Sequence, residues 1–191
     1  MDAYQEQFLR DEFFSLTLMA TVQRADVYTS DPDVKDRKAF RNALRSKLEQ
    51  IAQGYKKQVP EETHIRNIVN LSTSLTSAYA KVLKDGRFRI GTAQKALNLY
   101  LKYLWCLGKI PPPPHCPFDS LIIAKLPAYK GPRWTALASE QEYRTLVSIA
   151  KDKAQRTPLA VWELQIYNKA RSFTAEESGS RGNRQGKEHK R

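Results

Sequence analysis

TAQKALNLYLKYLWCL, residues 92–107, is the stretch that decides the fold. Its apolar and aromatic side chains are interrupted by few polar residues and continue over more than four helical turns. A helix that is apolar on nearly all sides is buried inside a protein. We therefore expect this segment to form a central helix that the rest of the chain covers.

Apolar residues recur at helical spacing on both sides of this segment. Capping residues mark two of the helix starts: Ser30-Asp31-Pro32-Asp33 and Ser139-Glu140-Gln141-Glu142. No segment alternates as a strand would, so the sequence predicts an all-α fold. The other expected helices are residues 2–24, 33–55, 60–84, 117–126, 139–155 and 157–171.

The domain organisation follows from where the apolar pattern ends. Residues 1–172 hold enough apolar side chains for one helical domain, with 41% of the whole chain hydrophobic. After Ser172 the chain consists mainly of Ser, Gly, Arg and Lys, without apolar periodicity. We expect residues 173–191 to be a disordered basic tail.

The charge balance predicts a polyanionic partner. The chain carries 32 Lys and Arg against 20 Asp and Glu, a formal net charge of +12, and only a small part of this excess lies in the tail. Such a surplus attracts phosphates, so we expect nucleic acid, most simply double-stranded DNA. No run is long and apolar enough to span a bilayer, and the polar N-terminus is unlike a signal peptide. These features predict a cytoplasmic monomer that does not bind a membrane.

Cysteine and histidine give no metal-site pattern. Cys106 and Cys116 lie on opposite sides of the proline run 111–114 and have no second pair nearby. The three histidines, His64, His115 and His189, are scattered along the chain. We therefore expect neither a metal ion nor another cofactor.

A glycine-containing hairpin, residues 85–91, precedes the central helix. A glycine at the start of a helix leaves backbone N–H groups and the positive end of the helix free for a DNA phosphate. An ordinary turn between two helices is the alternative. The DNA contacts that we predict are Arg87, Arg89, Gly91, Thr92 and Lys102.

Lys95, Asn98 and Lys102 form one polar stripe on the apolar helix. A desolvated lysine has a lowered pKa and can act as an amine nucleophile, although a lysine can instead extend its charge to the surface. The stiff Pro111–Pro114 segment leads to Asp119, which could simply cap the next helix. A carboxylate held opposite a buried lysine is also the pair needed to cleave an N-glycosidic bond.

The order of these motifs resembles the helix-hairpin-helix DNA glycosylase superfamily, which includes 8-oxoguanine glycosylase and endonuclease III. The resemblance covers residues 84–126 and rests on Ile90-Gly91-Thr92-Ala93-Gln94-Lys95-Ala96 and on Cys116-Pro117-Phe118-Asp119-Ser120. It implies two helical lobes, base flipping, and excision of a damaged or modified base, with Lys95 and Asp119 as catalytic residues. The family's Leu-Pro-Gly-x-Gly hairpin is replaced here by Arg87-Phe88-Arg89-Ile90-Gly91.

Several aromatic and polar side chains could receive an everted base. The predicted base pocket consists of Asn98, His115, Phe118, Trp134 and Trp162. The sequence does not name the base: lesions and the modified bases of viral DNA both fit, so repair and defence against phage stay open. A helical DNA-binding protein without catalysis is the main alternative. A ribonuclease motif, Arg-x-x-x-x-His at Arg184 to His189, also occurs, but it falls in the predicted tail, and we interpret it as chance.

Overall fold

The computed structural model describes the backbone of residues 2–182 and the side chains of residues 2–170. This part of the chain is all-helical and contains no strand, as predicted; its only bridge pairs Tyr28 with Leu83. No helix in it is long and apolar enough to cross a bilayer. The main helices are α1 (Ala3–Leu18), α2 (Val34–Gln53), α3 (Glu61–Tyr79), α4 (Ile90–Cys106), α5 (Ser120–Ile123), α6 (Glu140–Ala154) and α7 (Leu159–Gly182).

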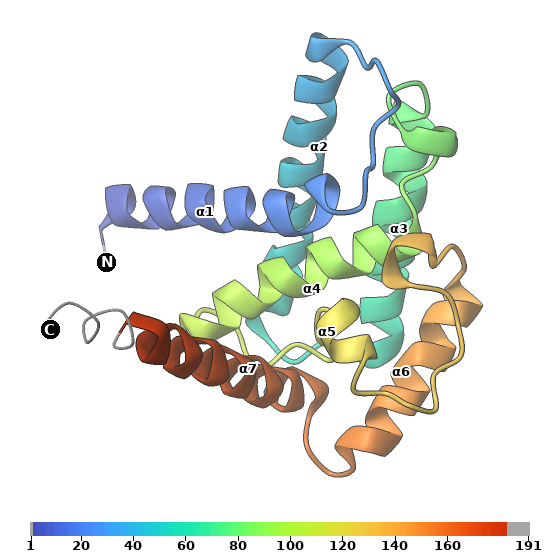
Figure 1. Cartoon of the computed structure of the whole chain (residues 1–191). Helices are drawn as coiled ribbons and strands as arrows, with labels where there is room; N and C mark the ends of the chain where they lie inside the picture. Colours follow the sequence, from blue (N-terminus) through green and yellow to red (C-terminus); the bar gives the residue numbers. More distant parts are fainter. Residues whose placement is uncertain (1, 183–191) are drawn as a thin grey trace, which may run out of the picture.

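Helix α4 is the predicted central helix. It crosses the middle of the molecule, with α1, α2 and α3 on one side and α6 packed against another (Figure 1). Its residues from Ile90 to Asn98 are all buried, and the apolar ones, Ile90, Ala93, Ala96 and Leu97, belong to one continuous hydrophobic core. The burial of α4 therefore determines how the other helices are placed.

Local capping explains where several helices begin. The Asp33 side chain accepts hydrogen bonds from two backbone N–H groups at the start of α2. Ser139 and Glu142 form a reciprocal capping box at the start of α6. Both starts agree with the sequence prediction, because a cap depends only on neighbouring residues.

Three segments differ from the expected helices, and one of them is α3, which ends at Tyr79 and not near the predicted end at 84. Helix α5 ends at Ile123, well short of the predicted end near 126, and Lys125 and Leu126 continue it only as turns. Between α1 and Arg24 the chain forms a π-helix, η1 (Met19–Gln23), in which the Thr21 hydroxyl donates to the Thr17 carbonyl oxygen at 2.6 Å. In these segments, tertiary contacts override the local helix propensity.

The backbone is helical beyond residue 172, where we expected the tail to begin. Helix α7 continues to Gly182, since residues 173–178 contain helix-forming Ala and Glu and no proline. Residues 183–191, with the arginine and histidine of the ribonuclease-like motif, lie outside the described residues.

The backbones of α4 and η4 approach each other so closely at position 91 that only glycine fits there. The short helix η4 (Trp134–Ala136) crosses the start of α4, and a Cβ added to Gly91 would lie 1.7 Å from the Trp134 carbonyl oxygen. The Gly91 N–H donates to the Leu137 carbonyl oxygen at 2.9 Å. Gly91 thus joins η4 to α4 and does not present its N–H group to solvent, contrary to the expectation for a DNA-binding hairpin.

Gly91→Ala should destabilise the fold by at least about 1–3 kcal/mol, because the clash is with backbone and cannot be relieved by a side-chain rotation. Gly54→Ala is the matched control, since a Cβ at Gly54 meets no atom within 4 Å. Urea unfolding of both variants measures the difference. Equal stability of the two variants would contradict the close approach.

Candidate active site

Lys95 and Asp119 lie side by side in the structure. The Lys95 Nζ is 3.6 Å from Asp119 Oδ2, and the two side chains are 4% and 31% exposed. Residues far apart in the sequence thus form an ion pair that solvent reaches from the carboxylate side. The sequence had predicted that these two residues act together.

Burial makes the Lys95 amine unusual. Desolvation lowers the pKa of Lys95, the negative charge of Asp119 opposes this shift, and the positive charge of Arg24 adds to it. The face of the Trp134 indole covers the ammonium group, with Nζ 4.3 Å from the ring centroid. A lowered pKa increases the fraction of neutral amine, which is the form that attacks carbon.

Asp119 has two functions at once. Its Oδ1 accepts hydrogen bonds from the backbone N–H groups of Leu121 and Ile122, at 3.0 and 3.2 Å, and so caps α5. The other oxygen, Oδ2, faces Lys95. The capping role and the ion pair, which the sequence offered as alternatives, are therefore compatible.

Gln94 holds the two halves of this site together. Its Nε2 donates to the Phe118 carbonyl oxygen at 2.8 Å, and its Oε1 accepts from the Phe118 N–H at 3.2 Å. Gln94 precedes Lys95 and Phe118 precedes Asp119, so this paired contact fixes the register of one against the other. The sequence analysis missed this role, although a glutamine inside an apolar helix was a signal that a partner was needed.

A second ion pair lies on the same helix, and it is fully inside the protein. Lys102 Nζ donates to both carboxylate oxygens of Glu163, at 2.7 and 2.8 Å, and the side chains are 10% and 5% exposed. Burial raises the pKa of Glu163, while the charge of Lys102 opposes this shift. The pair joins α4 to α7. Lys102 is thus not on a surface that could contact DNA, contrary to the prediction.

The other predicted DNA contacts are divided between surface and interior. Arg87 is exposed, and Arg89 is partly buried and paired with Asp85. Thr92, like Gly91, is buried beneath neighbouring elements, because α4 begins inside the core. Only Arg87 and Arg89 therefore remain as surface cations among the predicted contacts.

The residues predicted to form the base pocket are used for packing and for internal hydrogen bonds. Asn98, His115 and Phe118 are fully buried, and Trp162 is half-buried against the core. Of the predicted group, only Trp134 contacts the Lys95 amine. The five residues do not form one open pocket, because the tertiary fold directs four of them into the protein interior.

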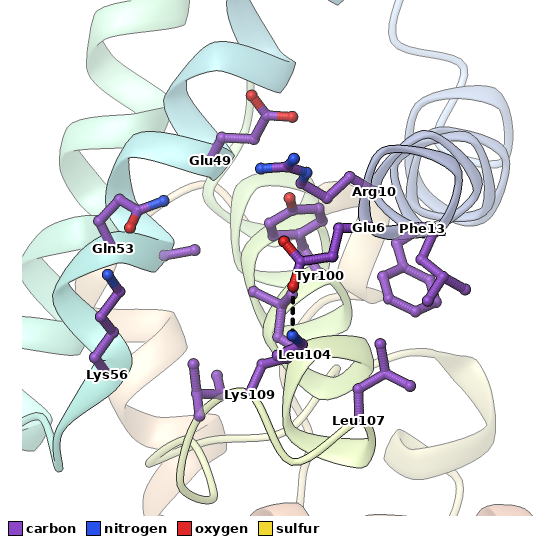
Figure 2. A pocket seen from close by; sticks show the side chains of 13 residues that line it. Glu6, Arg10, Phe13, Glu49, Gln53, Lys56, Tyr100, Leu104, Leu107 and Lys109 are labelled. Atoms are coloured by element: carbon purple, nitrogen blue, oxygen red, sulfur yellow. Dashed lines mark hydrogen bonds and ion pairs between the residues drawn. The ribbon is translucent and has the colours of Figure 1, made fainter. Parts of the chain in front are cut away.

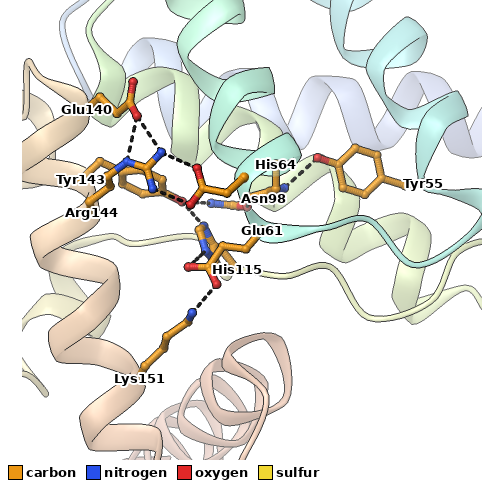
Figure 3. Close-up of polar contacts among 10 residues, drawn as sticks. Tyr55, Glu61, His64, Asn98, His115, Glu140, Tyr143, Arg144 and Lys151 are labelled. Carbon is orange, nitrogen blue, oxygen red and sulfur yellow. Dashed lines mark hydrogen bonds and ion pairs between the residues drawn. The ribbon is translucent and has the colours of Figure 1, made fainter.

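Asn98 and His115 belong to a chain of hydrogen bonds through the core (Figure 3). Asn98 Oδ1 can only accept, so His64 donates from Nε2 at 2.9 Å, and His64 Nδ1 accepts from the Tyr55 hydroxyl at 2.7 Å. The Tyr143 hydroxyl then accepts from Asn98 at 3.3 Å, and it donates to Nδ1 of His115 at 2.8 Å. Both histidines are therefore neutral, with every ring nitrogen in use.

The chain ends at a cluster of charges between α3 and α6. His115 Nε2 lies 3.3 Å from Glu61, which also pairs with Lys151. The hydrogen bond from His115 is the main reason that the pKa of Glu61 is lowered to about 2. Next to it, Arg144 binds Glu62 through two hydrogen bonds of 2.7 and 2.8 Å. The polar chain thus connects α4 to the solvent-facing edge of the protein.

No group of three or more potential metal ligands lies close together among the described residues. No protein-family model, curated protein or solved structure matches this chain. The interpretation of the site therefore rests on its own geometry and on the motif resemblance.

Acid should unfold this protein through His64. Burial lowers the pKa of His64 to about 3, and burial also lowers the pKa of His115. In the unfolded chain these histidines have the ordinary pKa of about 6.5 and become protonated below that pH. In the folded state they stay neutral to a lower pH, so acid favours the unfolded chain. Stability is therefore complete above pH 6.5 and is lost as the pH falls toward 3. His64 alone should lower the free energy of unfolding by about 2 kcal/mol between pH 7 and pH 5.

Urea unfolding at pH 7, 6 and 5 measures this loss. In the His64→Gln variant, the part of the pH dependence of the unfolding free energy that is due to His64 should disappear, whatever the stability of the variant at pH 7. A wild-type stability that does not change over this interval would show that the histidines titrate freely in the folded state.

Proposed function

We propose that this protein is a DNA glycosylase that removes a damaged or modified base and forms a Schiff base through Lys95. The observation that carries the proposal is the Lys95 and Asp119 pair, with its distance of 3.6 Å and the lowered pKa of the buried amine. The pair matches in type and order the two catalytic residues of the helix-hairpin-helix glycosylases. In this proposal the two lobes of that family correspond to the helices on either side of α4.

The proposed chemistry uses both residues. Asp119 Oδ2 accepts a proton from the Lys95 ammonium group, and the neutral amine attacks C1′ of the deoxyribose. The C1′–N bond breaks, its electron pair leaves with the base, and the base takes up a proton. The attached nitrogen then gives up a proton, and its lone pair breaks the C1′–O4′ bond while O4′ takes up a proton, which opens the sugar ring and gives the protonated Schiff base. The Asp119 carboxylate also stabilises the positive charge that develops on the sugar.

Trp134 would contact the everted nucleotide in this proposal. Its indole covers the Lys95 amine, and in the absence of DNA it excludes solvent from that group. An incoming sugar and base must displace the indole or stack on it. The everted base then approaches from the side where Asp119 is exposed.

Four cations near the pair are suited to hold the DNA backbone. Arg24 follows η1, and Lys125, Lys130 and Arg133 lie on the segment between α5 and η4. All four are exposed, and none forms an ion pair with another described residue. A hydrogen bond of 3.0 Å from the Tyr129 hydroxyl to the Pro132 carbonyl oxygen closes the loop that carries Lys130 and Arg133. Phosphates bound here would bring a nucleotide to Lys95.

Incubation with duplexes that each carry one modified base, followed by borohydride reduction, tests the chemistry. Wild-type protein should release a base and give a covalent adduct. Lys95→Ala should abolish the adduct, because it removes the proposed nucleophile, and Asp119→Asn should reduce base release by at least about 100-fold. Asp119→Asn can still cap α5, so circular dichroism should show a folded variant.

The substrates should include lesions and the bulky modified pyrimidines of viral DNA. Base release without an adduct would remove Lys95 as the nucleophile and keep Asp119. Tight DNA binding with no product from any substrate would support the alternative, a helical DNA-binding protein without catalysis.

The salt dependence of DNA binding tests the three of these cations that lie between α5 and η4. In the triple variant Lys125→Ala, Lys130→Ala and Arg133→Ala, the slope of log affinity against log salt concentration should fall by roughly 2–3, because each phosphate contact contributes about 0.9. The matched control replaces Lys57, Lys153 and Arg156, three exposed lysines and arginines that also form no ion pair with a described residue. Equal losses in the two triple variants would mean that binding depends on net charge alone.

A further inference from the structure

A cavity of about 440 Å³ lies between α1, α2 and α4, at the end of α4 that is distant from Lys95 (Figure 2). Its volume falls in the range of sites that bind small molecules. Phe13 from α1, Leu104 from α4 and Ile110 contribute apolar lining. The cavity is therefore large enough for a ligand with a flat apolar part.

Tyr100 supplies a buried polar group in this cavity. The residue is 2% exposed, and its hydroxyl forms no hydrogen bond with any described residue. Burial raises the pKa of Tyr100 to about 12, so the hydroxyl keeps its proton and remains a donor. The hydroxyl oxygen itself still reaches the cavity, since the fully buried side-chain oxygens without a partner among the described residues are those of Thr17 and Tyr28. It can therefore donate to a ligand or to water.

The charges around the cavity leave a positive excess. Glu6 and Lys109 neutralise each other in an ion pair of 2.7 Å, which Figure 2 shows at the mouth. Glu49 pairs with Arg45 at 2.9 Å. Arg10 and Lys56, which also line the cavity, form no ion pair with a described residue. Arg45 also binds Asp11, so it does not neutralise Glu49 alone. The lining residues carry three cations against two carboxylates, a net charge of +1, and Arg10 and Lys56 are the cations available to bind an anionic group.

The orientation of α4 separates this cavity from Lys95. Tyr100 follows Lys95 by five residues, which is a rotation of about 140° around the helix axis at 100° per residue. The two side chains therefore leave α4 on different faces. A ligand in the cavity would contact α1 and α2, and it would not contact the Lys95 and Asp119 pair.

We propose that this cavity binds a small anionic molecule with an aromatic or flat apolar body. The Tyr100 hydroxyl donates a hydrogen bond to the ligand, Arg10 and Lys56 pair with its negative group, and Phe13 and Leu104 contact its apolar part. Because Arg10 and Phe13 belong to α1 while Lys56 follows α2, the bound ligand also ties these two elements to α4.

Fluorescence titration with 1-anilinonaphthalene-8-sulfonate, an aromatic anion, tests the site. N-phenyl-1-naphthylamine is the matched neutral probe, because it has the same rings without the sulfonate. We expect one molecule of the anionic probe to bind per chain, and to bind about tenfold more tightly than the neutral probe. Equal affinity of the two probes would overturn the proposal, since a merely apolar surface does not distinguish them.

Single substitutions locate the bound probe. Arg10→Gln, Lys56→Gln and Tyr100→Phe should each weaken binding of the anionic probe by several-fold to tenfold. Lys57→Gln is the control, because Lys57 is exposed next to Lys56 but does not line the cavity. The proposal fails if the three variants bind the probe as the wild type does, or if Lys57→Gln weakens binding equally.

Thermal unfolding of each variant, without the probe, separates loss of the site from loss of the fold. Arg10 is exposed, so Arg10→Gln leaves the core unchanged even if Tyr100→Phe alters it. Lys95→Ala and Asp119→Asn should bind the anionic probe normally. Their probe binding therefore reports on the cavity whether or not the protein is a glycosylase.

Discussion

The need to satisfy buried polar groups on α4 organises the whole structure. Besides the small Thr92, four long or amide-bearing polar side chains, Gln94, Lys95, Asn98 and Lys102, are buried on a helix that is mostly apolar. An unpaired amide or ammonium group in that position would cost several kcal/mol, so each must find a partner. The partners come from several parts of the chain: Phe118 and Asp119 before α5, His64 on α3 with Tyr143 on α6, and Glu163 on α7.

This constraint also explains why the candidate site is preorganised. Gln94 fixes the backbone before Asp119, the cap of α5 fixes one carboxylate oxygen, and Trp134 covers the amine. A reactive group that is held by packing and by surrounding hydrogen bonds loses little entropy when a substrate arrives. The same contacts stabilise the fold, so the structural and the proposed catalytic functions of these residues are linked.

The ends of α4 lead to two different surfaces. Near its start lie the Lys95 pair and the unpaired cations of the segment between α5 and η4, which are suited to a nucleic-acid backbone. Near its end lies the cavity with Tyr100, Arg10 and Lys56, which is suited to a small anion. In the two proposals, part of the large positive charge of the chain thus serves two separate surfaces, and α4 runs from one to the other.

The sequence by itself determined the helical class, the central place of residues 92–107, the caps at Asp33 and Ser139, and the pairing of Lys95 with Asp119. These features depend on periodicity, on neighbouring residues, or on two motifs in a known order. Tertiary structure decided the rest: Lys102 pairs with Glu163, Gly91 admits the Trp134 backbone, and Asn98 and His115 join a core network. Local sequence does not specify these outcomes. A polar residue inside an apolar helix needs a hydrogen-bond or ion-pair partner, but which distant residue becomes that partner depends on how the helices pack.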